Sequence, residues 1–236
     1  GQKSNQVKER LTQAIEQRLS SLKMSEIQQR MEHERADVSL PGVGFPDGHC
    51  HPISQVLEEL QQLFARLGYS VVHGPDVEDE WHNFESLNIP ADHPSRDMHD
   101  TFYLTDGRLL RTHTSPVQIH ALQAQKPPIR ILAPGRVYRC DNDASHSPIF
   151  HQIEGLALDR DICFADLKGT LRFFISEYFG AELPMRLRPS YFPFTEPSAE
   201  LDMGCVFCKG SGCNVCKQTG WIEILGCGMV GPAVLQ

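Results

Sequence analysis

The sequence lacks any apolar stretch long enough to cross a membrane. Its longest apolar stretches, such as residues 129–133, are far shorter than the about 20 residues of a membrane-spanning helix. No charged segment followed by an apolar one opens the chain, so no secretory signal is predicted. We therefore expect a cytoplasmic protein that makes no contact with a membrane.

The sequence also lacks an excess of positive charge. It holds 22 Lys and Arg residues against 30 Asp and Glu residues, which gives a formal net charge of −8. This balance argues against a surface that coats nucleic acid generally. Residues 1–37 are the exception, because their seven basic and six acidic residues make them the segment least repulsive to a polyanion.

Residues 5–36 contain neither Pro nor Gly, and their apolar side chains recur at helical intervals. This pattern predicts one or two helices with a narrow apolar stripe, in which Ser21 or Ser25 marks a bend or a new cap. A coiled-coil arm and an ordinary surface helix fit the stripe equally well. Pro and Gly crowd residues 41–48, which predicts a hinge. We accordingly predict a helical arm at 1–37 and a second domain at 38–236.

The sequence pattern of the second domain predicts an α+β fold, in which helices flank an antiparallel β-sheet. Strand patterns follow one another with helices at intervals, and the sequence shows neither an internal repeat nor a βαβ rhythm. The predicted helices span residues 52–67, 116–124 and 165–179, the first ending at Gly68. The predicted strands span residues 69–72, 109–112, 129–138, 150–158, 185–189 and 221–226.

Two Cys-x-x-Cys pairs lie close together in the C-terminal part of the chain. Their members are Cys205, Cys208, Cys213 and Cys216. Four thiolates complete a tetrahedral shell around one zinc ion, and the glycines between the pairs let the backbone wrap tightly. We predict a structural Zn²⁺ in a knuckle inserted at 203–219. A redox Cys-x-x-Cys pair, unbound cysteines and an iron–sulfur cluster are the alternatives.

Residues 135–141 and 150–155 predict two antiparallel strands joined by a polar loop. Arg139 and Asp141 share one face of the first strand, and Phe150, Gln152 and Glu154 share a face of the second. An arginine can hold a phosphate bidentately, and an aromatic ring offers a flat base a stacking surface. The pattern indicates a nucleotide site, and a surface ion pair beside core aromatics is the alternative.

This hairpin resembles motif two of the class II aminoacyl-tRNA synthetases, which is an Arg-x-Asp/Glu strand, a loop and a return strand with Phe. The preceding helix and strand, residues 52–75, resemble motif one, a long helix followed by a strand that ends in Pro. Several longer stretches resemble the α-subunit family of bacterial-type phenylalanyl-tRNA synthetases, and together they cover nearly everything from residue 37 onward. They are residues 80–90 (EWHNFESLNIP), 109–115 (LLRTHTS), 133–139 (APGRVYR), 188–198 (RPSYFPFTEPS) and 226–230 (GCGMV).

The resemblance implies a set of ATP-binding residues. Arg139 would grip the α-phosphate, and His146 would lie near the outer phosphates, which makes these two the implied catalytic residues. Phe150 would stack on the adenine, with Asp141 near its amino group. Glu196 would help to hold a Mg²⁺ ion.

The resemblance also implies a phenylalanine-binding set. Its members at the amino and carboxylate ends of the substrate are His113, Ser115, Gln118, Gln152 and Glu154. Phe192 and Phe194 would clasp the substrate ring, since aromatic edges against an aromatic face favour a ring-shaped ligand. Plain core packing is the alternative for these two side chains.

The resemblance as a whole implies a phenylalanine–tRNA ligase that uses ATP and Mg²⁺ to form phenylalanyl-adenylate from L-phenylalanine and then charges tRNA(Phe). It also implies an α2β2 heterotetramer with a separate β subunit. Three departures accompany it: no motif three precedes Gln236, the arm is shorter than the family's, and the cysteine knuckle is an insertion. We therefore expect this stretch alone to be inactive. A non-catalytic zinc protein that binds nucleic acid or another protein is the competing hypothesis.

Overall fold

The computed structural model describes residues 1–34, 39, 42, 44, 48–93, 101–140, 147–180 and 183–236. Contacts within the chain divide it into two units, Gly1–His49 and Cys50–Gln236. Most of the predicted hinge at 41–48 lies outside the described residues. No described helix is both long enough and apolar enough to span a membrane.

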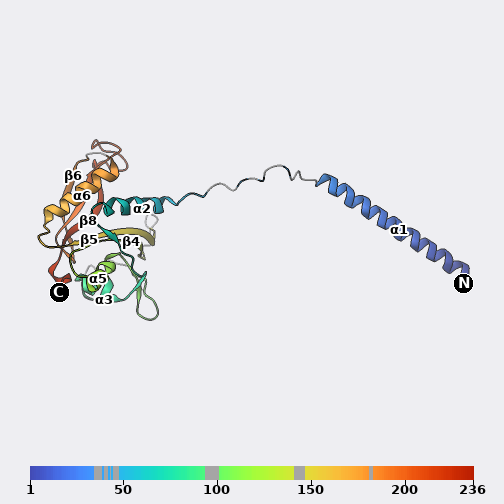
Figure 1. Ribbon diagram of the computed structural model, residues 1–236, viewed down its shortest axis with the longest axis horizontal. Helices are drawn as coiled ribbons and strands as arrows, with labels where there is room; N and C mark the ends of the chain where they lie inside the picture. The colour runs from blue at the N-terminus through green and yellow to red at the C-terminus, as the bar shows by residue number, and fades with distance from the viewer. Residues whose placement is uncertain are drawn as a thin grey trace. The chain divides into compact units, whose positions relative to one another are not determined.

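The first unit contains one long helix, α1 (Gln2–His33), drawn in blue in Figure 1. Neither Pro nor Gly interrupts it, and strong helix formers such as Gln, Glu, Lys and Leu fill it. The helix runs without a break through Ser21 and Ser25, so of the predicted one or two helices the structure has one, and the predicted new cap is wrong. Its apolar stripe is exposed in this unit, with Leu11 at 59% and Ile15 at 58% exposure.

The described residues of the second unit form three small β-sheets. In the first sheet, β1 (Ser70–Val71) lies parallel to β4 (Ile129–Tyr138), and β4 pairs antiparallel with β5 (Ile149–Leu158). The second sheet is an antiparallel meander of β6 (Met185–Phe192), β7 (Thr195–Gly204) and β8 (Trp221–Val230). The third is the antiparallel pair β2 (Val77–Glu78) and β3 (Leu109–Leu110).

Helices cover these sheets and bury their apolar side chains. Figure 1 shows α2 (Pro52–Ala65) and α6 (Phe164–Phe179) on one side of the β4–β5 hairpin, and α3 (Glu80–Asn83) and α5 (Ser115–Ala124) on the other. Leu171, Phe174 and Ile175 of α6 pack against Leu201 and Met203 of β7. A separate cluster joins α5 to the hairpin through Ala121, Ile129, Ile131 and Leu156. The described residues of this unit also form two short 3₁₀ helices, η1 (Glu85–Leu87) and η2 (Pro232–Val234).

The α+β class is therefore as predicted, with two corrections. The strands form separate sheets rather than one, and the β1–β4 pairing is parallel rather than antiparallel. Strand β7 was not predicted, because Glu196, Pro197 and Glu200 mask the alternation of its buried Ala199 and Leu201. Helix α2 also ends at Ala65 rather than at Leu67; the turn that follows contains Gly68, whose φ of +81° suits a residue without a side chain.

Candidate active site

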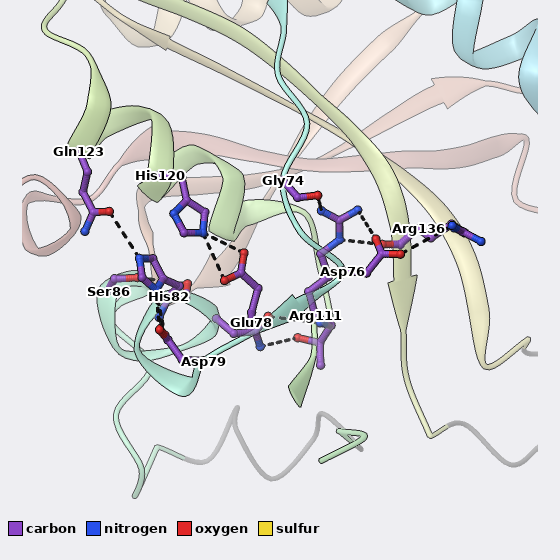
Figure 2. A network of polar contacts seen from close by, with 12 residues as sticks. Gly74, Asp76, Glu78, Asp79, His82, Ser86, Arg111, His120, Gln123 and Arg136 are labelled. Carbon is purple, nitrogen blue, oxygen red and sulfur yellow. Dashed lines mark hydrogen bonds and ion pairs between the residues drawn. The ribbon is translucent and has the colours of Figure 1, made fainter. Parts of the chain in front are cut away.

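A buried arginine anchors the segment that carries His113 and Ser115. The Arg111 side chain is 3% exposed, and its Nη2 lies 3.2 Å from the Asp76 carboxylate. Its Nε donates to the Arg136 carbonyl at 2.8 Å, and its Nη1 to the Gly74 carbonyl at 3.2 Å (Figure 2). At position 135 a Cβ atom would lie only 2.0 Å from Arg111 Nη2, so a glycine there lets the guanidinium pass under β4. The arginine thus ties β3, β4 and residues 74–76 together.

A buried asparagine holds the next residue of the same segment. Asn83 of α3 is fully buried, and its Nδ2 donates to the Thr112 hydroxyl at 3.0 Å. The Thr112 backbone N–H donates back to Asn83 Oδ1 at 3.3 Å. Because both polar ends of the amide are engaged, the residue fixes the backbone that leads into α5.

The β4–β5 hairpin brings an arginine and an aromatic ring together. The register pairs Val137 with Phe150, and the Arg139 N–H donates to the Pro148 carbonyl at 3.0 Å just beyond the last pair. The Arg139 guanidinium carbon lies 5.0 Å from the centroid of the Phe150 ring. Its Nε donates to the Thr112 carbonyl at 3.1 Å, which orients the guanidinium plane. A planar cation over an aromatic face is suited to a phosphate beside a stacked base.

The same face of β5 carries Glu154, whose carboxylate is tightly held from α5. Ser115 Oγ donates to Glu154 Oε2 at 2.7 Å, and Gln118 Nε2 donates to the same oxygen at 2.6 Å. Desolvation raises the pKa of this carboxyl above that of an ordinary glutamate, although hydrogen bonds from Ser115, Thr114 and Gln118 oppose the rise. A desolvated carboxyl of this kind gains stability from a cation that reaches it.

Gln152 lies between Phe150 and Glu154 on this face, opposite Gly135. Its Oε1 is buried and accepts no hydrogen bond from any residue that the structure describes. A buried acceptor without a donor is costly, at about 1–3 kcal/mol, so a ligand N–H at this point would be stabilising. His113 is also buried, at 6% exposure, and meets the Phe84 ring edge-on with centroids 6.5 Å apart.

Phe192 is the last residue of β6, and Phe194 lies in the turn between β6 and β7. Their rings are stacked, with centroids 6.1 Å apart and planes 24° from parallel. Phe194 packs against the buried cluster that contains Phe84, the ring that His113 also contacts. Phe192 lies directly over Gly226 of β8, where a Cβ atom would come within 2.6 Å of the ring. Packing against a hydrophobic core is thus one role of Phe194, whereas the ring of Phe192 lies in space that a strand glycine leaves open.

Of the remaining predicted site residues, the structure describes Glu196 but not Asp141 or His146. Glu196 is exposed near the start of β7, so its carboxylate is open to a hard cation such as Mg²⁺. Asp141 and His146 lie outside the described residues, and their predicted positions beside ATP stay predictions.

The four clustered cysteines form a compact sulfur shell. The Sγ atoms of Cys205 and Cys213, of Cys208 and Cys216, and of Cys213 and Cys216 are each 3.7 Å apart. Sulfurs about 2.3 Å from a shared zinc ion would lie about 3.8 Å apart in a regular tetrahedron.

Backbone N–H groups point at two of the four sulfur atoms. Cys216 Sγ accepts backbone N–H bonds from Cys213 at 3.2 Å and Gly220 at 3.3 Å, and Cys208 Sγ accepts one from Gly212 at 3.2 Å. Against the desolvation of its surroundings, these bonds lower the pKa of Cys216 to about 6. Against a backbone hydrogen bond from Cys216, desolvation and hydrogen bonds with neighbouring sulfurs raise the pKa of Cys213 to about 11, so the fit to zinc rests on the distances between the four sulfurs.

Sequence reasoning missed the residues that hold this site in place. Arg111 was noted only within a longer stretch, and Asp76 and Asn83 were given no role. Their partners are 25 to 62 residues away in sequence, so no local pattern reveals the contacts. A signal was nevertheless present, because an arginine flanked by Leu110 and Thr112 at the end of a strand must find a partner if it is buried.

Comparison with known proteins defines the class. Residues 35–236 match the family model of the class II core domain of tRNA synthetases (F). Over 232 residues the chain is 58% identical to the phenylalanine–tRNA ligase alpha subunit of Pseudomonas savastanoi pv. phaseolicola, covering 98% of this chain and 69% of the relative. The corresponding subunits of Pseudomonas fluorescens and Pseudomonas putida are 57% and 56% identical over the same shares. The chain belongs to the family of phenylalanine–tRNA ligase alpha subunits, whose names do not favour the competing hypothesis of a non-catalytic zinc protein.

Proposed function

We propose that this protein activates L-phenylalanine with ATP and transfers the phenylalanyl group to tRNA(Phe). The observation that carries the proposal is the single face of β5, on which Phe150, paired with Arg139, and the half-buried Glu154 lie four residues apart. Four strand residues span roughly 13 Å, which leaves room for a nucleotide at one end and an ammonium group at the other.

The proposed chemistry is positioning and charge neutralisation. A carboxylate oxygen of phenylalanine attacks the α-phosphorus of ATP, a new P–O bond forms, and the bond to pyrophosphate breaks. Arg139 binds the α-phosphate with its guanidinium, already oriented by Thr112, while Phe150 stacks on the adenine and Asp141 lies near its amino group. His146 contacts the outer phosphates. A terminal ribose hydroxyl of the tRNA then attacks the phenylalanyl carbonyl, and AMP leaves.

The proposed phenylalanine site uses groups from α5, β5 and the segment before α5. The substrate ammonium donates to Glu154 and to Gln152 Oε1, the buried acceptor that has no partner among the described residues. Ser115 and Gln118 hold the carboxylate of Glu154, and His113 is the buried residue two positions before Ser115. Phe192 and Phe194 clasp the ring, for which their stacked pairing and the glycine beneath Phe192 are the support.

The proposal includes two metals and a partner subunit. Mg²⁺ would neutralise phosphate charge, with the exposed carboxylate of Glu196 as a ligand, since class II synthetases use ATP and Mg²⁺. A structural Zn²⁺ would be held by the four cysteines at 205–216 in the knuckle of 203–219. The relatives are named alpha subunits, which supports a β subunit in an α2β2 assembly, and charging of tRNA for translation implies a cytoplasmic location. We also propose 1–37 as the arm and 38–236 as the catalytic core.

A substrate panel tests the proposal. In the native assembly, ATP–pyrophosphate exchange is measured with phenylalanine, tyrosine and leucine in turn. Phenylalanine should support exchange; tyrosine should support it with a kcat/KM roughly 5- to 150-fold lower, because a buried hydroxyl without a partner costs about 1–3 kcal/mol. Exchange that proceeds equally well with leucine, or without any amino acid, would overturn the proposal.

A further inference from the structure

Away from the residues assigned to synthetase chemistry, a carboxylate and two imidazoles meet between α3, α5 and β2. Glu78 ends β2, His82 lies in α3, and His120 lies in α5 (Figure 2). One candidate ligand atom from each of the three lies within 4.8 Å of the others. Glu78 is 4% exposed, so its charge is held in a site that water scarcely reaches.

The contacts inside this cluster resemble those of a metal site before its ion binds. His120 Nε2 lies 2.9 and 3.2 Å from the two carboxylate oxygens of Glu78. His82 Nδ1 lies 2.9 and 3.0 Å from the oxygens of Asp79, which leaves Nε2 as its ligand atom. That Nε2 makes only a long contact among the described residues, 3.4 Å to Gln123 Oε1. A carboxylate that binds the rear nitrogen of an imidazole is the usual outer partner of a metal-bound histidine.

We propose that Glu78, His82 and His120 form a third metal site, for a divalent transition-metal ion of the Zn²⁺ or Ni²⁺ type. Two imidazoles and one carboxylate favour such ions over Mg²⁺, and three protein ligands leave a further coordination position to water. The ion takes the place of the direct Glu78–His120 hydrogen bond. The imidazole rings of His82 and His120 now stack with centroids 4.2 Å apart and planes 23° from parallel. Binding of one ion by both Nε2 atoms would require the two rings to leave this stacked arrangement.

An ion bound at this site would affect the proposed active site through helix α5. His120 sits on the same ten-residue helix as Ser115 and Gln118, the two side chains that hold the Glu154 carboxylate. A metal bridge from α5 to α3 and β2 would therefore restrain the helix that positions them. The site itself does not depend on the proposed function, because its ligands have no part in that chemistry.

Metal stoichiometry in the native assembly tests the site. Weakly held ions are removed with a chelator, and Ni²⁺ is then titrated into wild-type protein, Glu78→Gln and the control His151→Gln, with bound nickel counted per chain. His151 is an exposed histidine on β5, and glutamine at 78 retains a hydrogen-bond acceptor for His120 but loses the charge. We expect Glu78→Gln to bind one Ni²⁺ per chain fewer than wild type and His151→Gln to match wild type. Equal stoichiometry in wild type and Glu78→Gln would overturn the proposal.

Two further measurements keep the test decisive. Co²⁺ bound at this site should lack the intense sulfur charge-transfer absorption that Co²⁺ shows at four thiolates. If the Co²⁺ ion that wild type binds and Glu78→Gln does not bind shows this absorption, the assignment is overturned. Should Glu78→Gln fail to fold, Asp79→Asn replaces it, because asparagine also caps a helix and preserves α3. Loss of the outer carboxylate should weaken Ni²⁺ binding about 10- to 100-fold. Unchanged affinity would contradict the arrangement.

Discussion

Replacement of Glu154 by glutamine tests how the site binds the substrate ammonium. The carbonyl oxygen of the glutamine can still accept the hydrogen bonds from Ser115 and Gln118, which are 2.7 and 2.6 Å long in the wild type. The fold should therefore survive, while the negative charge is lost. A hydrogen bond between charged groups contributes about 1.5–3 kcal/mol, so the dissociation constant for phenylalanine should rise roughly 10- to 150-fold. Calorimetry measures this, with Glu177→Gln on α6 as the control; unchanged affinity in Glu154→Gln would refute the reasoning.

The pH dependence of the same variant gives an independent check. Desolvation raises the pKa of Glu154 in the folded protein. Above the ordinary pKa of a glutamate, the folded protein then binds more protons than the unfolded chain. The free energy of unfolding therefore falls as the pH rises through the folded-state pKa. Glu154→Gln should lack this decline, and bound phenylalanine should reduce it in wild type, because an ammonium favours the carboxylate. Parallel stability curves for the two proteins would contradict the raised pKa.

The remaining predictions concern three structural features. Cys208→Ser should release one zinc per chain and loosen the knuckle while the sheets stay folded, as elemental analysis and circular dichroism would show; freshly reduced wild type without stoichiometric metal would refute this. Asn83→Ala should lower the free energy of unfolding by about 1–3 kcal/mol in denaturant titration, because the buried Thr112 loses its partner; an unchanged midpoint would refute it. Gly226→Ala should raise the KM for phenylalanine by displacing Phe192, whereas Gly169→Ala, which meets nothing within 4 Å, should not; equal effects would contradict the proposed ring clamp.

The parts of the fold with clear periodicity could be predicted from the sequence. Strand β4 spans residues 129–138, as its alternating pattern predicts, and α6 begins one residue before the predicted 165–179. Strand β7 could not be predicted in this way, because Glu196, Pro197 and Glu200 mask its apolar pattern. Its Asp202 is 3% exposed and is held by Arg186 and Arg188 of β6, so the strand also buries a charge whose partners no local pattern shows.

The candidate site, too, could be predicted only in part. The face shared by Phe150, Gln152 and Glu154 follows from strand geometry, and the register bears it out. The links from Glu154 to Ser115 and from Arg139 to Thr112 join different elements, 39 and 27 residues apart in sequence. Strand geometry alone does not predict such contacts; the resemblance grouped some of these residues, and only the fold shows how they touch.

The most direct test of the account is the effect of Arg139→Ala on phenylalanine-dependent ATP–pyrophosphate exchange in the native assembly. The bidentate contact from Arg139 should strengthen as pyrophosphate departs, so its loss should fall on kcat more than on phenylalanine affinity. Such a contact contributes about 2–4 kcal/mol in a water-poor site, so exchange should drop on the order of a hundredfold or more. Arg139→Lys should not restore it, because a point charge cannot reproduce the planar fork held by the Thr112 carbonyl. If Arg139→Ala leaves exchange unchanged, the β4–β5 hairpin is not the ATP site and the central claim is contradicted.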